Sequence, residues 1–364
     1  MYAYVPLCLP ITACIALIVL VLSIIASTDT AFAHTVNRYV GGVVRMVLAW
    51  VTGIFPFSLA EGLLLFSPVL LCILIALSVK YTKRGLRAGF RYLGVLLSIL
   101  LLLYPMFVFG LGMGFSEPTL DEKFGIEKKP VSAEALYEAI LWTMEEAAAL
   151  CDEVTFAEDG SSYMPYDDYE DMCDDLMLGY ARLYKEYPVF FNFPSRVKPV
   201  ILSEPMSYTH ITGIYTFFTG ESNININFPD YTIPYTAAHE LAHQRGFARE
   251  DEANFIAFLV CANANDPYTR YSAYINMTEY LSNALHSADL EIWKDAMRSL
   301  DTRLYGEMLA YNKFFEKYRD NPVEKVSSAA NDAYLKSQGQ SAGVQSYGLV
   351  VDLAVAYYNS KISD

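Results

Sequence analysis

The stretch HELAHQRGFAREDEAN, residues 239–254, decides how the polar part of this 364-residue chain folds and what it can bind. In a helix, His239 and His243 lie about one turn apart, so both imidazoles project from one face and can bind one ion. Glu240 lies beside the first histidine, where a carboxylate can take a proton from water and return it to a leaving amine. The motif therefore predicts a Zn²⁺ site with His239 and His243 as ligands and Glu240 as the catalytic base.

A catalytic zinc site needs a third protein ligand and keeps one position open for water. Gly246 can end the first helix in a left-handed conformation, and a second helix begins with acidic residues just after it. The candidates for the third ligand are Glu250, Asp251 and Glu252. The spacing alone does not choose among them.

Hydrophobic and acidic residues are separated along the chain. The composition is 54% hydrophobic and yet includes 41 acidic residues, nearly all of which follow Glu117. We therefore expect a membrane domain over residues 1–115 and an outer domain over residues 116–364. The net charge of -15 argues against nucleic acid as a partner, because phosphates would be repelled.

Three apolar runs in the first domain are each long enough to cross a hydrocarbon core of about 30 Å. They cover about residues 5–27, 59–79 and 93–115. A cleaved signal peptide ending near Ala31 to Ala33 is the alternative for the first run, but its length and the lack of a basic start favour a membrane span. Residues 37–55 are amphipathic and are expected to lie at the membrane interface.

Basic residues near the second and third spans predict the orientation. Short loops rich in lysine and arginine stay in the cytoplasm. We expect a cytoplasmic N-terminus and an extracytoplasmic C-terminal domain in a multi-pass protein of the cell membrane, with the lipid bilayer as partner. The predicted loop contains Lys80, Lys83, Arg84, Arg87 and Arg91.

Helices and short strands alternate in the outer domain. A helix is predicted from a Ser132 cap, and a second over about residues 167–187, stopped by Pro188. Residues 196–204 and 207–229 are rich in β-branched and aromatic residues, which favours short strands. ESNININ, residues 221–227, is the candidate edge strand for binding substrate backbone, with an ordinary packed strand as the alternative. The fold class is therefore α+β.

The segment EDEAN, residues 250–254, resembles the Glu-x-x-Ala-Asn element of several zinc peptidase families of the Glu-zincin type. This resemblance implies that Glu250 is the third metal ligand and that Asn254 bonds to a histidine ring. Glu252 is the second choice.

A broader resemblance covers nearly the whole chain. The three apolar runs, TGIYTFFTGESNININ, HELAHQRGFAREDEANF and DAYLKSQGQSAGVQSYGLVVDLAVAYY together resemble the membrane family catalogued as domain of unknown function 3810. The resemblance implies a zincin-like outer domain, mostly helical with a small β-sheet. It also implies a membrane-anchored zinc metallopeptidase that hydrolyses an unknown protein or peptide substrate outside the membrane. The alternative is a non-catalytic receptor or scaffold of the cell envelope, against which the intact Glu240 argues.

Some other residues are weaker candidates. Tyr347 or Tyr208 could donate a hydrogen bond to an oxyanion, and Glu221 and Tyr235 could reach the site from the strand side. One disulfide is possible among the cysteines of the outer domain, which are Cys151, Cys173 and Cys261.

The basic residues between the second and third spans predict where the C-terminus lies. A reporter enzyme that works only outside the cytoplasm, fused after Asp364, should be active. Activity of a cytoplasm-only reporter at the same position would reverse the predicted orientation.

Overall fold

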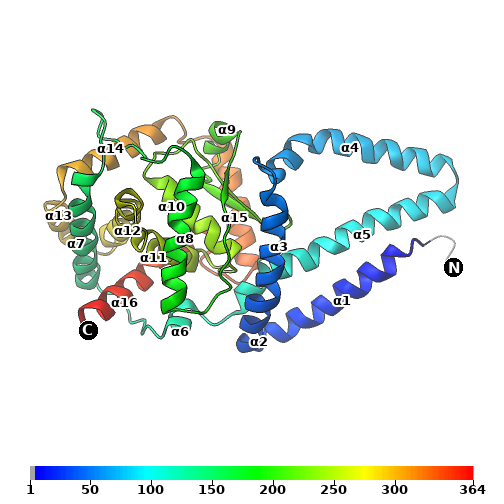
Figure 1. The fold of residues 1–364 in the computed structure, drawn as a ribbon, viewed down its shortest axis with the longest axis horizontal. Coiled ribbons are helices and arrows are strands. Elements are labelled where there is room, and N and C mark those ends of the chain that lie inside the picture. The colour runs from blue at the N-terminus through cyan, green and yellow to red at the C-terminus, as the bar shows by residue number, and fades with distance from the viewer. Residues whose placement is uncertain (1–4, 364) are drawn as a thin grey trace.

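Three long apolar helices extend away from the rest of the chain in the computed structural model, which describes residues 5–363 (Figure 1). They are α1 (Cys8–Ala26), α4 (Leu59–Lys83) and α5 (Leu86–Gly110). By length and composition, each could cross a membrane. Most large apolar side chains of α4 are exposed, as lipid contact requires. The predicted membrane association is confirmed at this level. Residues 1–4 and 364, at the ends of the two predicted domains, lie outside the described residues.

The boundaries of the third apolar helix differ from the prediction. α5 begins at Leu86 rather than near residue 93 and ends at Gly110, before a short 3-10 helix, η2 (Gly112–Ser116). Only Arg84 and Gly85 separate α4 from α5. The predicted basic loop is therefore wrong: most of its basic residues lie on the two helix ends. Lysine and arginine are good helix formers, so charge did not mark where the helices end.

A break in the helical pattern connects α1 to α4. The chain passes through α2 (Thr30–Thr35), a π-helix, η1 (Val36–Gly41), and α3 (Gly42–Gly53). α3 lies between the long helices and the outer part of the chain (Figure 1). Trp50 and Val51 are exposed, whereas Arg45 and Thr52 are buried. This two-sided character agrees with the amphipathic helix expected there.

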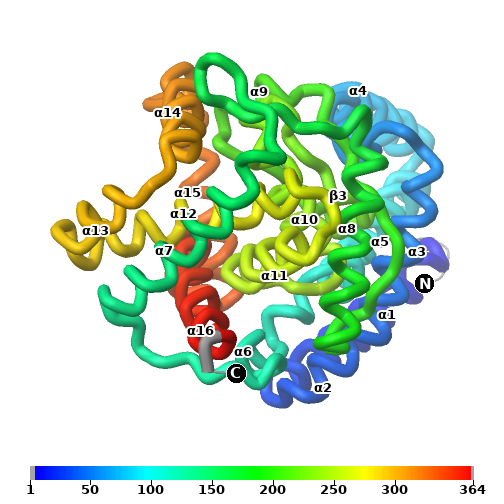
Figure 2. Tube along the Cα trace, turned by 60° about the vertical axis from the view of Figure 1, so that its left-hand side comes forward, coloured from blue at the N-terminus to red at the C-terminus, as the bar shows by residue number. Residues whose placement is uncertain are grey.

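The outer part is mostly helical, with α10 and α11 at its centre (Figure 2). Every residue of α10 is buried. α11 packs against α8, α12 and α16 as well as α10. The remaining elements are α6 (Leu120–Phe124), α7 (Ala133–Leu150), η3 (Cys151–Glu153), α8 (Tyr169–Glu186), α9 (Ser203–Ser207), α10 (Thr232–Gln244), α11 (Glu250–Ala262), α12 (Pro267–Ala288), α13 (Leu290–Met297), α14 (Thr302–Glu316), α15 (Pro322–Ser337), η4 (Gly343–Leu349) and α16 (Val350–Ser363).

Both predicted helices of this region are present, and the first begins at its expected cap, Ser132. The Ser132 hydroxyl accepts a hydrogen bond from the Ala135 N–H at the start of α7. The Asp168 carboxylate accepts two at the start of α8, from Glu170 and Asp171. Such caps satisfy amide groups that have no partner inside the helix. Cys151, Cys173 and Cys261 are all free and buried, so none of them forms a disulfide.

A three-stranded sheet packs against α10. It consists of β1 (Val197–Pro199), β2 (Gly213–Thr216) and β3 (Glu221–Ile224), in the order β1-β3-β2. β1 is parallel to β3, and β2 is antiparallel to it. The ESNININ segment therefore forms the central strand, and its prediction as the edge strand is wrong. β2 has the free edge next to the motif helix. Residues 203–207 form α9 instead of extending β1.

A buried hydrogen-bond network joins the membrane part to the end of α10. The Arg45 guanidinium donates to the side-chain oxygen of Asn37 (2.7 Å) and to the carbonyl oxygens of Phe109 (2.9 Å) and Arg245 (3.3 Å). The Asn37 amide in turn donates to the Gly246 carbonyl oxygen (2.9 Å). Arg45 has no exposed surface. Because buried polar groups must be paired, these bonds fix the outer part on α3 and η1.

Replacing Arg45 with methionine should destabilise the whole protein, because several buried acceptors would lose their donor. We expect a loss of about 3 kcal/mol or more, seen as a lower unfolding temperature in detergent. Arg38→Met is the matched control, since Arg38 is half-buried and lies over the Tyr39 ring. Equal unfolding temperatures for the two variants would contradict the role of Arg45.

Candidate metal centre

A tight turn places α11 against the end of α10. Gly246 has a φ of 98°, a left-handed conformation that favours glycine. The Gly246 and Phe247 N–H groups donate to the carbonyl oxygens of His243 and Ala242, which closes the helix end. A side chain at residue 246 would also meet the Arg45 guanidinium at 2.5 Å. Glycine is thus required by both conformation and space.

His239, His243 and Glu250 converge on one buried point. Each offers one ligand atom, and these atoms lie within 4.8 Å of one another. The two Nε2 atoms are 2.9 Å apart, and Glu250 Oε2 lies 3.2 Å from that of His239 and 3.4 Å from that of His243. A tetrahedral metal site needs three such donors and one open position. The helix spacing and the turn together produce this arrangement.

Hydrogen bonds on the far side of each ring determine which nitrogen faces the cluster. His243 Nδ1 lies 2.7 Å from the Phe247 carbonyl oxygen, which can only accept, so Nδ1 carries the proton. His239 Nδ1 lies 2.8 Å from Asn254 Oδ1, whose own amide donates to the Tyr347 carbonyl oxygen. In their neutral forms both rings would therefore direct Nε2 lone pairs at each other and at a carboxylate. A cation between these three electron-rich atoms, either a metal ion or a proton, removes their mutual repulsion.

The charged groups of the cluster also shift one another's pKa values. Burial alone would lower the pKa of His243, but the charge of Glu250 raises it to about 9. Burial opposes ionisation of Glu250 as well, yet His243 and His239 hold its pKa well below the usual range. Among the described residues, Glu250 Oε2 faces the two imidazoles and has no other partner, although it is buried. An orphaned carboxylate oxygen facing two imidazole nitrogens fits a divalent metal such as Zn²⁺.

Glu240 lies beside the cluster with one oxygen unused. The residue is 4% exposed, and its Oε2 has no partner among the described residues. Burial raises its pKa, while the neighbouring histidines oppose this. A β-carbon on Gly213 of β2 would come within 2.6 Å of its side chain, so the strand passes directly over it. Its carboxylate lies where a base next to the cluster is needed.

The three acidic candidates at the start of α11 have different surroundings. Glu250 faces the histidines, whereas Glu252 accepts hydrogen bonds from the Arg249 guanidinium (2.7 Å) and the Leu120 N–H (3.0 Å). Lys123 lies 3.7 Å from its other oxygen. Asp251 is half-buried, and burial raises its pKa to about 6. The carboxylate of Glu252 is thus used to hold the segment after η2, and only Glu250 among the three joins the cluster.

Of the weaker candidates, Tyr347 lies nearest the cluster. Its ring stacks on His239, with centroids 6.4 Å apart, and its hydroxyl accepts a hydrogen bond from the Asn331 amide. Tyr235 lies one helical turn before His239 and donates to the Asn254 carbonyl oxygen. Tyr208 instead packs on Tyr318.

Glu221 is also turned away from the cluster. It binds the Lys198 ammonium and the first N–H groups of α4. Its strand pattern gave no signal of this, because the N–H groups that it binds lie in the membrane part and Lys198 lies on another strand.

A cleft opens beside His239, Glu240 and Tyr347. A cavity of about 360 Å³ lies between the residues that lead into β2 and one face of α15. A second cavity of about 280 Å³ shares Thr212, His239 and Tyr280 with it. Sequence patterns did not indicate Gly213, Asn331 or Tyr280, which come from three separate elements. The cluster is therefore reachable by a ligand larger than water.

The fold and the cluster define a membrane-associated, mostly helical protein whose central helix pair gathers two histidines and a glutamate. The chain belongs to the family described as Protein of unknown function (DUF3810), whose family model matches residues 37–355. This match confirms the family resemblance and covers η1, α3, the sheet and the whole cluster. No curated protein and no solved structure matches the chain.

Removing any of the three converging side chains should abolish metal binding. His239→Ala, His243→Ala and Glu250→Ala should each reduce zinc in the purified protein from about one equivalent to near zero, as elemental analysis would measure. Glu252→Gln is the matched control: it should retain zinc but unfold at a lower temperature, because Arg249 and Lys123 lose a charged partner. Zinc retained by Glu250→Ala and lost by Glu252→Gln would reverse the choice of third ligand.

Proposed function

We propose that this protein is a membrane-anchored zinc metallopeptidase that hydrolyses peptide bonds outside the membrane. The observation that carries the proposal is the convergence of His239, His243 and Glu250 beside Glu240, with His239 and Glu240 lining a cleft next to the edge strand β2. A metal site built only for stability would be closed by a fourth protein ligand. None of the described residues supplies one.

His239, His243 and Glu250 would hold the ion through Nε2, Nε2 and a carboxylate oxygen. When bound, Zn²⁺ supplies the Lewis acidity that polarises a peptide carbonyl and makes water more acidic. Asn254 and the Phe247 carbonyl oxygen orient the two rings and keep the proton on Nδ1. Such outer partners increase ligand basicity and fix geometry.

Glu240 moves the proton in the proposed reaction. The water oxygen bonds to the carbonyl carbon while its proton passes to the Glu240 carboxylate. The carbon–nitrogen bond then breaks, and Glu240 gives this proton to the amine nitrogen. One water is consumed, and a carboxylate and an amine are released. Burial already raises the pKa of Glu240 toward the range useful for such a base.

β2 is suited to hold the substrate backbone. Thr212 and Ile214 direct their hydrogen-bonding groups toward β3, as the bond from Asn225 N–H to the Thr212 carbonyl oxygen indicates. In an antiparallel pair the intervening residues, Gly213 and Tyr215, then direct theirs to the other edge, where the Tyr215 backbone also forms a hydrogen bond with Glu240. A peptide could add to this edge as a further strand. The edge strand β2 lies over the motif helix α10, and Glu250 lies on the next helix, α11. Both features support a zincin-like arrangement.

Tyr347 supports the proposal as a hydrogen-bond donor. Burial and the charge of Glu250 raise the pKa of its hydroxyl well above the usual value, so it stays protonated. It lines the cleft beside His239. A protonated phenol there could stabilise the developing oxyanion.

The extracytoplasmic location rests on the basic residues near the turn between α4 and α5. Lys80 and Lys83 lie in the last turn of α4, and Arg87 lies in the first turn of α5. Their cytoplasmic placement would put the outer part on the opposite side of the membrane.

The replacement Glu240→Gln separates catalysis from structure. It keeps the size of the side chain and the three metal donors but cannot accept a proton. Zinc content and unfolding temperature should stay near those of the parent protein. The rate of hydrolysis should fall by about a hundred- to ten-thousand-fold, measured on a broad peptide library by mass spectrometry.

Glu307→Gln is a suitable control, because Glu307 is a buried carboxylate on α14 that binds the Ser162 N–H and the Tyr271 hydroxyl. The folded control should still hydrolyse peptides. A zinc-loaded parent that cuts nothing, with Glu240→Gln reproducing its cellular effects, would favour the non-catalytic scaffold instead.

A further inference from the structure

The hairpin formed by β2 and β3 packs against the membrane part of the chain. A β-carbon on Gly110, the last residue of α5, would meet Phe217 at 2.8 Å, and the Phe217 ring packs edge-on against Phe107 at 5.4 Å. A β-carbon on Gly220 would meet Leu48 of α3 at 2.5 Å. The tip of the hairpin is therefore wedged between the end of α5 and one side of α3.

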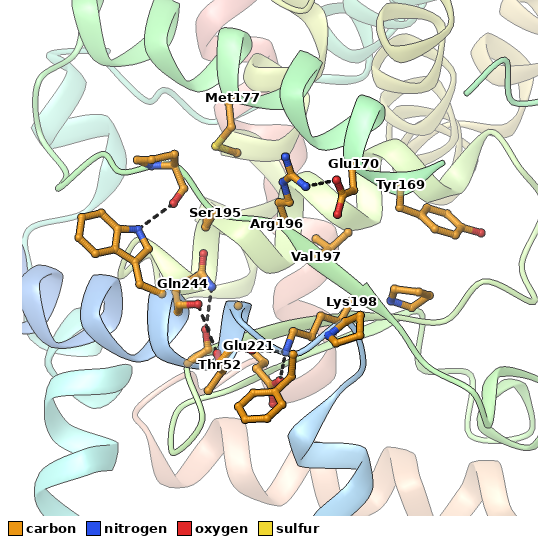
Figure 3. Close-up of a pocket in the computed structure, with 18 of the residues that line it drawn as sticks. Thr52, Tyr169, Glu170, Met177, Ser195, Arg196, Val197, Lys198, Glu221 and Gln244 are labelled. Carbon is orange, nitrogen blue, oxygen red and sulfur yellow. Dashed lines mark hydrogen bonds and ion pairs between the residues drawn. The ribbon is translucent and has the colours of Figure 1, made fainter. Parts of the chain in front are cut away.

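Polar contacts hold the same hairpin close to its tip and also hold the neighbouring strand β1. Glu221 accepts hydrogen bonds from the Leu59 N–H (3.0 Å) and the Ala60 N–H (2.9 Å), at the first turn of α4. Lys198 of β1 donates to the Thr52 carbonyl oxygen (2.8 Å). Figure 3 shows Thr52, Lys198 and Glu221 together, beside a cavity of about 630 Å³. The strands are thus fixed to α3 and α4 as well as to α5.

The opposite wall of the cleft is formed by α15, and it contacts the segment that follows α5. Phe115, in η2 just after α5, packs edge-on against Tyr334 of α15 at 6.5 Å. Between them, a β-carbon on Gly114 would meet the Gly246 carbonyl oxygen at 2.4 Å. The segment that follows α5 therefore contacts both α15 and the turn between α10 and α11, next to the metal cluster.

The distance from the cluster to the end of α5 is short. Gly213 of β2 lies over Glu240, and Phe217, four residues later, lies against Gly110. At about 3.3 Å per residue in a strand, this path is only about 13 Å long. A peptide paired along β2 would therefore run between the cluster and the point where α5 ends.

Exposed apolar side chains continue beyond the long helices onto this junction. Ile54 and Ile201 are each 77% exposed, and Phe57 is 48% exposed. Ile201 belongs to the outer part, and its N–H donates to Glu61 of α4. Such side chains fit a surface that rests against lipid rather than against water.

From these contacts we propose that the substrate is the membrane-proximal segment of a membrane-anchored polypeptide, cut within about ten residues of its anchor. The inference rests on the proposed peptidase function and on α5 crossing the bilayer. β2 has only four residues, so it offers few backbone hydrogen bonds to a free peptide. An anchor shared with the enzyme's membrane raises the local concentration of the segment and compensates for this weak binding.

The test uses the full-length, zinc-loaded protein in phospholipid vesicles. The probe is a library of randomised peptides joined directly to a single hydrophobic helix that inserts in the same vesicles. A second library carries a flexible Gly-Ser spacer of about 30 residues before the helix, which moves the randomised segment about 30 Å away. A third library has no helix. Mass spectrometry gives the rate and position of every cut.

We expect cuts to cluster within about ten residues of the helix, at a rate at least about tenfold above that of the free library. For the library with the spacer, we expect one of two results. The cuts fall mainly in the spacer and in the randomised residues next to it, or the randomised segment is cut more slowly than in the directly anchored library. Equal rates for the free and anchored libraries, with positions unrelated to the helix, would overturn the substrate class and leave the peptidase intact. If no library is cut, the proposed function itself fails, and this inference fails with it.

A variant pair tests the role of the hairpin directly. Phe217→Ala removes the ring that packs on Phe107, whereas Phe218→Ala removes its neighbour, which packs on Phe217. Phe217→Ala should broaden the distribution of cut positions more than Phe218→Ala, at equal zinc content. Identical, unchanged distributions would contradict the hairpin as the element that sets the distance.

Discussion

The guanidinium of Arg45 is buried where three parts of the chain meet, and the relative placement of these parts depends on its hydrogen bonds. It binds oxygens from η1, from the end of α5 and from the last turn of the motif helix. A buried arginine can keep its charge only when its donors are satisfied. Moving the membrane part away from the metal cluster would leave these buried polar groups without hydrogen-bond partners, which is energetically costly.

The same principle organises the cluster itself. The Nε2 atoms of His239 and His243 and one oxygen of Glu250 are pressed together out of water, with lone pairs facing inward. In a medium of low dielectric constant this arrangement is unfavourable without a positive charge between the atoms. The packing of α10 and α11 thus creates a site that a bound cation stabilises. The two histidines share one helix, and Glu250 reaches them only when the turn at Gly246 forms.

Local patterns in the sequence predicted the features that local forces determine. The apolar helices, the cap at Ser132 and the motif helix all follow from hydropathy, capping and periodicity. The choice of Glu250 needed a family resemblance, because the spacing left Asp251 and Glu252 open.

The sheet order could not be predicted, because alternation in residues 221–227 shows a strand but not its partners. Arg45 looked like an ordinary polar residue of an interfacial helix, and only its contacts with distant carbonyl groups reveal its role.

The π-helix at η1 gives the connection between α1 and α3 an unusual property. A π-turn contains one residue more than an α-turn, and it occurs here at Asn37, which binds the Gly246 carbonyl oxygen. Loss of a single residue from this turn would let it close as an α-turn with little rotation of α2 relative to α3, but it would change the position of Asn37. The extra residue of the π-turn is thus linked to the hydrogen bond between Asn37 and the turn that carries the metal cluster. Length variation in this short segment should be far less tolerated than in the surface loops of the outer part.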